Sequence, residues 1–106
     1  FSLSNELEFS QGICTGEVKI PSFLFNHPQS ICKHTLCKTN ALLNMLKQYN
    51  IKRANAIAIG DSLNDLCMIR NAGMGVAFCS SSELVNQSAD MIISEPSFSR
   101  LLNIAL

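Results

Sequence analysis

The sequence is short of charge, of aspartate and of any long apolar run. Lysine and arginine number 8, as do aspartate and glutamate, so the formal net charge of the 106 residues is zero. This balance excludes a broad basic surface for nucleic acid and an acidic surface for basic partners. Apolar residues make up 47% of the chain, which argues against a disordered tail. No apolar run approaches the roughly 18 residues of a membrane span.

The chain also lacks an initial methionine and a basic, signal-like start. Its first nine residues carry two glutamates and no basic residue, which argues against a secretory signal. Charged residues make up 15%, against about a quarter in an average soluble domain. These features predict a trimmed or partial chain that buries one face against something else. The five cysteines are odd in number and irregularly spaced, which predicts free thiols in a reducing cytoplasm.

The N-terminal part of the chain predicts a hairpin. Residues 6–9 and 13–20 alternate polar and apolar side chains, and Gly12 lies between them. This pattern is typical of two short antiparallel strands joined by a tight turn. We therefore expect residues 1–20 to form a β-hairpin or flap.

The next stretch has no regular pattern. Pro21 and Pro28 interrupt residues 21–37, which we expect to form an irregular connection. Phe23 and Phe25 give this stretch an apolar patch that either covers the mouth of a site or packs beneath the domain.

From residue 38 onward, helical and extended patterns alternate. Apolar side chains recur at helical spacing between Lys38 and Tyr49. Later segments predict strands at 56–59, 75–78 and 91–93, and helices at 63–72, at 80–89 (with Ser80 and Glu83 as a capping box) and from Pro96 to 104. The alternation predicts an α/β fold in which a parallel sheet carries helices on both faces.

Two of the three aspartates lie directly after the first of these strands. Asp61 and Asp65 are four residues apart, and Asn64 lies between them. Ligands of open α/β sheets bind at the carboxyl ends of strands, and Mg²⁺ takes one or two protein carboxylates. We therefore predict a magnesium site with Asp61 as direct ligand and Asp65 supporting the metal shell. Asn64 is expected to hold a phosphate oxygen or to orient Asp61.

A plainer interpretation of the same residues is a structural turn. Gly60 permits a tight turn, after which Asp61 or Ser62 caps the following helix. Similarly, residues 80–82 are better explained by helix capping than by nucleophilic catalysis.

Residues 60–78, GDSLNDLCMIRNAGMGVAF, resemble the fourth motif of the haloacid dehalogenase superfamily, whose members are mostly phosphatases. The resemblance continues through residues 86–90. Residues 5–18 resemble the hairpin that phosphoserine phosphatases carry before their lysine motif. Residues 76–79 fit that branch better than they fit sugar phosphatases or the phosphorylation domains of P-type ATPases. The likeness covers nearly the whole chain except roughly residues 20–37.

The resemblance implies a fold and a set of roles. Residues 38–106 would form the C-terminal half of a haloacid dehalogenase-like hydrolase core. An ungapped alignment makes Lys38 the lysine that neutralises the phosphoryl group, with Lys33 as the competing candidate. Lys38 and Asn64 would hold phosphoryl oxygens, and Asp65 would fix Lys38 or the metal shell.

The family's nucleophile is missing from these residues. The resemblance implies an aspartate that attacks phosphorus and a second acid two residues later, but no Asp-x-Asp occurs in the chain. We therefore predict that the chain alone is inactive and that an upstream half, in cis or in trans, supplies the nucleophile. The intact protein would be a Mg²⁺-dependent phosphate monoester hydrolase, with phosphoserine the favoured substrate. The alternatives are an inactive half-domain that binds phosphate or a partner, a sugar-phosphatase relative, and the phosphorylation domain of a cation pump.

A second set of possible metal ligands lies in the irregular stretch, between His27 and Cys37. The spacing His-x₄-Cys-x-His-x₂-Cys matches no common structural zinc arrangement and favours ordinary loop residues. Cys67 and Met68 follow Asp65 on the same predicted helix and are expected to pack in the core. The residues of the spaced group are His27, Cys32, His34 and Cys37.

Overall fold

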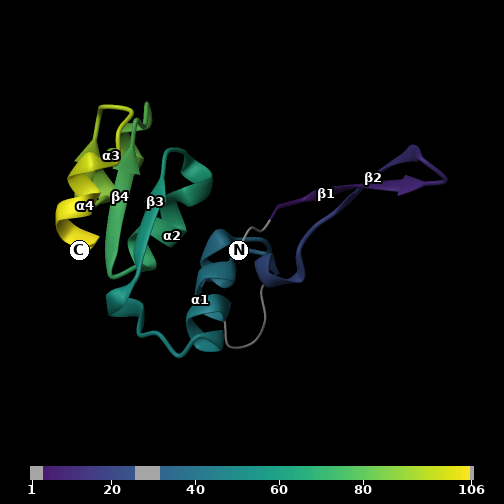
Figure 1. The fold of residues 1–106 in the computed structure, drawn as a ribbon, viewed down its shortest axis with the longest axis horizontal. Helices are drawn as coiled ribbons and strands as arrows, with labels where there is room; N and C mark the ends of the chain where they lie inside the picture. Colours follow the sequence, from purple (N-terminus) through teal and green to yellow (C-terminus); the bar gives the residue numbers. More distant parts are fainter. Residues whose placement is uncertain (1–3, 26–31, 106) are drawn as a thin grey trace.

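The computed structural model describes residues 4–25 and 32–105 (Figure 1). It contains an antiparallel hairpin and a separate parallel sheet, with strand order β3-β4-β5. The α/β prediction is confirmed. The strands are β1 (Glu6–Ser10), β2 (Ile13–Lys19), β3 (Ile57–Gly60), β4 (Met74–Phe78) and β5 (Met91–Ile93), and the helices are α1 (Lys38–Gln48), α2 (Leu66–Asn71), α3 (Glu83–Ser88) and α4 (Ser99–Ala105).

The hairpin reaches away from the rest of the molecule (Figure 1). Gln11 and Gly12 turn the chain with φ angles of 52° and 80°, and positive φ at both central residues is the geometry that matches the twist of the paired strands. The pairing becomes irregular between Leu7 and Phe9. Both side chains are more than half exposed, at 59% and 60%, so the apolar face of the hairpin is uncovered.

Side-chain alternation along β4 divides the core into two layers. Ala77 packs with Ile69 of α2 and Val85 of α3 on one face of the sheet. Val76 packs with Ile93 and with Leu101 of α4 on the other. Successive strand residues point to opposite faces, so one strand holds helices against both faces, as the sequence predicted.

Strand β3 is less buried than the sequence predicted. The run at 56–59 predicts a strand that is covered on both faces, but the side chains of Ile57 and Ile59 are 39% and 38% exposed. Among the described residues β3 pairs only with β4, so it is an edge strand with an open side. A short apolar run predicts a strand but does not reveal which part of the chain covers it.

Three helix boundaries differ from the prediction. The first turn of the predicted helix at 63–72 is a 3₁₀ turn over Leu63–Asp65, and α2 starts only at Leu66. Helix α3 is capped by Ser82, whose side chain accepts the Val85 amide, so the predicted Ser80 capping box is wrong. Helix α4 starts at Ser99 rather than near Pro96, after a local turn in which Ser97 Oγ accepts the Ser99 amide. No helix in the described ranges is long and apolar enough to cross a membrane.

Candidate active site

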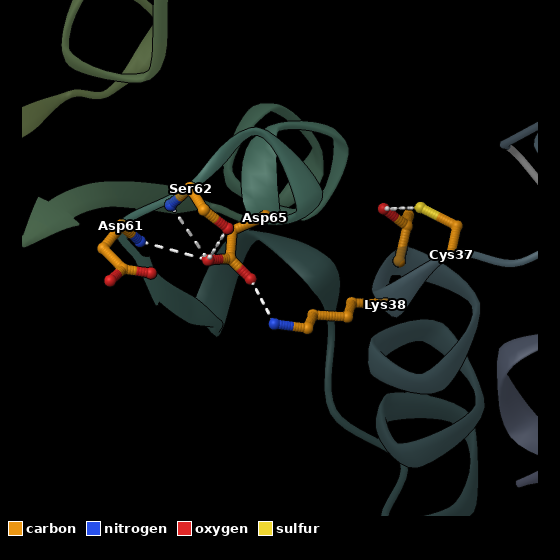
Figure 2. Close-up of polar contacts among 6 residues, drawn as sticks. Cys37, Lys38, Asp61, Ser62 and Asp65 are labelled. Carbon is orange, nitrogen blue, oxygen red and sulfur yellow. Dashed lines mark hydrogen bonds and ion pairs between the residues drawn. The ribbon is translucent and has the colours of Figure 1, made fainter. Parts of the chain in front are cut away.

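The side chains of Lys38 and Asp65 meet at the carboxyl end of β3. Lys38 is the first residue of α1, and Figure 2 shows its side chain extending toward Asp65. The Lys38 Nζ atom lies 2.5 Å from Asp65 Oδ1. Within residues 4–25 and 32–105 this is the only side-chain ion pair. The sequence placed the two residues in one site, and the fold brings them into contact.

The second oxygen of Asp65 organises the loop after β3. Oδ2 accepts the backbone amide of Asp61 at 3.1 Å and that of Ser62 at 3.3 Å. Because Asp65 is only 4% exposed, these contacts satisfy a carboxylate that would be costly to bury without partners. Asp65 N in turn donates to Ser62 O. Ser62 is the N-cap of the 3₁₀ turn that follows. The plainer interpretation of these residues, as a structural turn with a helix cap, is therefore confirmed as well.

Gly60 is required by a close approach rather than by a special backbone angle. A Cβ atom at Gly60 would lie 2.3 Å from Asp65 Cβ. No larger residue leaves Asp65 in its present position, because interiors do not absorb an overlap of that size without a shift. The sequence predicted a tight turn here, and the structure supplies a different physical reason for the glycine.

Asp61 differs from Asp65 in its surroundings. Its side chain is exposed, and among the described residues no donor is hydrogen-bonded to its carboxylate. Its backbone is held on both sides, since the amide donates to Asp65 and the carbonyl accepts from Ser80 Oγ at 2.6 Å. A fixed backbone with a free carboxylate suits a hard cation such as Mg²⁺, which takes oxygen ligands and keeps several waters. The role of Ser80 was missed in the sequence, because local capping patterns do not report a contact 19 residues away.

An open cavity of about 760 Å³ adjoins the ion pair and is lined by Lys38 and Asn64, among others. Arg70 also lines this cavity, but its guanidinium donates to Ser88 Oγ at 3.1 Å and 3.3 Å. Lys38 and Asn64 therefore offer polar groups to a ligand in the same space. Lys33, the competing lysine, is exposed and does not line the cavity.

Asp90, the third aspartate, has a structural position. Its Oδ2 accepts the Gly75 amide at 2.7 Å, and its own amide donates to Gly75 O at 2.8 Å. Gly75 lies near the start of β4, whereas the loop of Asp61 follows the end of the parallel strand β3. The two aspartates therefore lie at opposite ends of the sheet.

The pKa of Asp65 is lowered from its ordinary value of 3.8. Burial alone raises the pKa, but the hydrogen bond from Lys38 and those from the Asp61 and Ser62 amides outweigh it. Hydrogen-bond donors and a nearby cation stabilise the charged form of a carboxyl group and so lower its pKa. The Asp65 carboxylate is thus ionised at neutral pH.

This shift predicts a specific acid sensitivity. A native pKa below the unfolded value means that Asp65 contributes stability that is fully present above about pH 5 and is lost as the pH falls through the native pKa. We expect the free energy of unfolding of Asp65→Asn to depend less steeply on pH than that of the wild type over this acid range. Urea unfolding at a series of pH values measures both slopes. Identical slopes would contradict the lowered pKa.

Of the spaced cysteine and histidine group, His27 lies outside the described residues. Cys32, His34 and Cys37 come together, and Cys67 of α2 joins them instead of packing as an ordinary core residue. Burial raises the pKa of Cys32 to about 11. Burial also raises the pKa of Cys37, but hydrogen bonds from Thr39 are among the contacts that outweigh it and lower the pKa to about 7. Sequence spacing could not show this cluster, because Cys67 is distant in the chain.

Comparisons with known proteins agree with this fold. Residues 14–98 match the model of the haloacid dehalogenase-like hydrolases. The chain is 34% identical over 96 residues to phosphoserine phosphatase SerB2 of Mycobacterium tuberculosis, covering 91% of this chain and 21% of that protein. It is 32% identical over 101 residues to a phosphoserine phosphatase of Streptococcus thermophilus, covering 95% of this chain and 42% of that protein.

Solved structures give the same result. A crystal structure of a phosphoserine phosphatase in its apo form matches with a TM-score of 0.76 and 25% identity, covering 95% of this chain and 45% of that one. A 3-deoxy-D-manno-octulosonate 8-phosphate phosphatase from Moraxella catarrhalis, in complex with magnesium and phosphate ions, matches with a TM-score of 0.52 and 31% identity. That match covers 55% of this chain and 33% of the other.

The chain belongs to the haloacid dehalogenase-like hydrolases, since the family model matches most of its length. Within that family it is similar to phosphoserine phosphatases over most of its length. The chain spans between about a fifth and two fifths of the length of the two phosphoserine phosphatases that it matches.

Proposed function

We propose that the protein containing this chain is a Mg²⁺-dependent phosphate monoester hydrolase whose aspartyl nucleophile lies outside these 106 residues. The observation that carries the proposal is the Lys38–Asp65 ion pair beside the free carboxylate of Asp61, at the carboxyl end of β3. This end of a parallel strand is where α/β folds bind ligands. Membership of a hydrolase family and similarity to phosphatases support the same chemistry.

The open side of β3 supports a missing half. Strand β3 pairs with β4 alone in the part of the chain that the structure describes, and its Ile57 and Ile59 side chains are uncovered. A further parallel strand added to this edge would end beside Asp61, because parallel strands carry their carboxyl ends to one edge of the sheet. An upstream Asp-x-Asp at the end of such a strand would complete the site.

The residues of this chain would then divide the work of phosphoryl transfer. The upstream aspartate carboxylate attacks phosphorus, the bond to the leaving oxygen breaks, and the second upstream acid protonates that oxygen. The same acid, now a base, then takes a proton from a water that attacks the aspartyl phosphate, which releases phosphate and restores the carboxylate. Lys38 and Asn64 hold the phosphoryl oxygens, and Asp65 keeps the Lys38 ammonium in place. Asp61 would hold a bound Mg²⁺, which would supply positive charge to stabilise the phosphoryl group.

The compartment is a separate point. All five cysteines are free thiols, and from this we infer that the protein works in a reducing cytoplasm.

Phosphoserine is the substrate we favour, because phosphoserine phosphatases match over more of the chain than the sugar-phosphate phosphatase does. A sugar phosphate is the second candidate, and it rests on the 31% identity with that relative over 55% of this chain.

Phosphate release by the protein isolated from its own cells tests the proposal. We expect faster release from L-phosphoserine than from sugar phosphates, complete dependence on Mg²⁺, and no release by the 106-residue chain alone. The absence of hydrolysis of every phosphate monoester, or equal activity after chelation of Mg²⁺, would contradict the assignment. Preference for a sugar phosphate would replace the substrate and leave the reaction class intact.

A further inference from the structure

Three cysteines and one histidine gather beside the segment that leads into α1. One ligand atom from each of Cys32, His34, Cys37 and Cys67 lies within 4.8 Å of all the others. The first three precede α1 in the chain, and Cys67 is in the first turn of α2. All of these thiols are free. The cluster therefore joins two parts of the chain that are far apart in sequence.

The spacing of the ligand atoms suits a small tetrahedral ion. Zinc–sulfur bonds of about 2.3 Å place two tetrahedral sulfurs about 3.8 Å apart. Cys32 Sγ lies 2.7 Å from His34 Nδ1, closer than the roughly 3.5 Å that zinc–sulfur and zinc–nitrogen bonds give at a tetrahedral angle, so these two atoms must move apart when the ion binds. The four ligand atoms lie within 4.8 Å of one another, so shifts of about 1 Å would bring them into this geometry. Thiolate and imidazole together select zinc over magnesium or calcium, which prefer oxygen.

Each sulfur also has a polar neighbour of the kind that supports a metal-bound thiolate. The His34 amide donates to Cys32 Sγ at 3.3 Å, Cys37 Sγ lies 3.3 Å from Thr39 Oγ1, and Asn71 Nδ2 donates to Cys67 Sγ at 3.6 Å. Such outer contacts orient ligands and stabilise their charge. Each of the three sulfurs therefore has a polar contact that would help to hold a metal-bound thiolate.

We propose that Cys32, His34, Cys37 and Cys67 bind one Zn²⁺ ion in a closed, structural site. All four tetrahedral positions come from the protein, so no position remains for a reacting water. On binding, the three thiols release their protons to solvent, and neutral His34 gives a ring nitrogen. The site is separate from the Asp61 magnesium site, whose ligands are oxygens.

The zinc site would hold both ends of the ion pair. Cys37 directly precedes Lys38, and Cys67 is two residues after Asp65. A metal bridge between them fixes the backbones that carry the Lys38 Nζ and the Asp65 carboxylate, 2.5 Å apart. This consequence for catalysis rests on the proposed phosphatase function, whereas zinc binding itself does not.

Metal content of the chain tests the proposal directly. The intact protein that contains this chain is reduced, incubated with micromolar free Zn²⁺, dialysed, and analysed for zinc per molecule. We expect one zinc in the wild type, loss of that zinc in Cys32→Ser and Cys67→Ser, and retention in Cys14→Ser and Cys79→Ser. The last two cysteines are exposed and lie outside the cluster, so they are matched controls.

A second readout does not depend on a cysteine variant folding. Co²⁺ in place of Zn²⁺ should give the thiolate charge-transfer and intense d–d absorption of a tetrahedral site in the wild-type chain. His34→Gln changes an exposed side chain and should shift the d–d bands. A wild type that retains no zinc, a Cys14→Ser or Cys79→Ser variant that loses it, or an octahedral cobalt spectrum would overturn the proposal. None of these outcomes depends on phosphate release, so the two proposals fail separately.

Discussion

Lys38→Met is expected to lower the rate of phosphate release by about 10²- to 10³-fold, the usual effect of removing one group that stabilises transition-state charge. The ammonium of Lys38 lines the cavity and contacts Asp65 at 2.5 Å. Methionine keeps most of the side-chain volume but removes the charge. Phosphoryl oxygens would lose their cation, and the nearly buried Asp65 would lose its counterion. The assay uses the intact protein with L-phosphoserine.

Two other lysines provide controls for this variant. Lys47 is exposed in the last turn of the same helix α1, so Lys47→Met should keep full activity. Lys33→Met should do the same, because Lys33 does not line the cavity. A large loss in Lys33→Met together with an unaffected Lys38→Met would show that the alignment of the lysine motif is wrong. The pair of results therefore decides between the two candidates that the sequence left open.

Asp61→Asn is expected to reduce Mg²⁺-dependent activity by about 1000-fold, since a metal ion contributes several kcal/mol of transition-state stabilisation. The substitution changes one carboxylate oxygen to an amide nitrogen and leaves the shape unchanged. The side chain is exposed, and the contacts of the residue are made by its backbone. Folding should therefore be unaffected, and the loss should be partly relieved by higher Mg²⁺ concentrations.

Asp90→Asn is the matched control, because it makes the same chemical change at the opposite end of the sheet. Asp90 Oδ2 accepts the Gly75 amide at 2.7 Å, so this variant should lose about 1 kcal/mol of stability. Its Mg²⁺-dependent activity per folded molecule should match that of the wild type. Equal losses of activity in the two variants would contradict the placement of the metal at Asp61.

The sequence predicted most of the parallel sheet, because local patterns carry this information. The apolar runs that became β3, β4 and β5 are short, and helical segments separate them. The position of Asp61 and Asp65 after a strand predicted the metal site, whereas Lys38 was placed by family resemblance, and the contact between Lys38 and Asp65 agrees with that placement. Spacing alone would not have selected Lys38 over Lys33.

What the sequence did not predict depends on contacts between distant residues. The Ser80 hydroxyl holds the Asp61 carbonyl, although its own neighbourhood is typical of a helix cap. Cys67 completes a cluster with cysteines about 30 residues earlier in the chain. The exposure of Ile57 and Ile59 likewise depends on which segment lies beside β3. Each of these features is a property of packing, which short patterns do not encode.

The most direct test of the proposed half-site is mass spectrometry of this polypeptide as its own cells produce it, with sequencing of any residues upstream. A phosphatase completed in cis should have a mass of about twice the 11.6 kDa of this chain or more. It should also contain an Asp-x-Asp after an apolar strand in the upstream part. A product of 11.6 kDa that releases no phosphate from phosphoserine, and that copurifies with no aspartate-bearing partner chain, would contradict the proposed catalytic function.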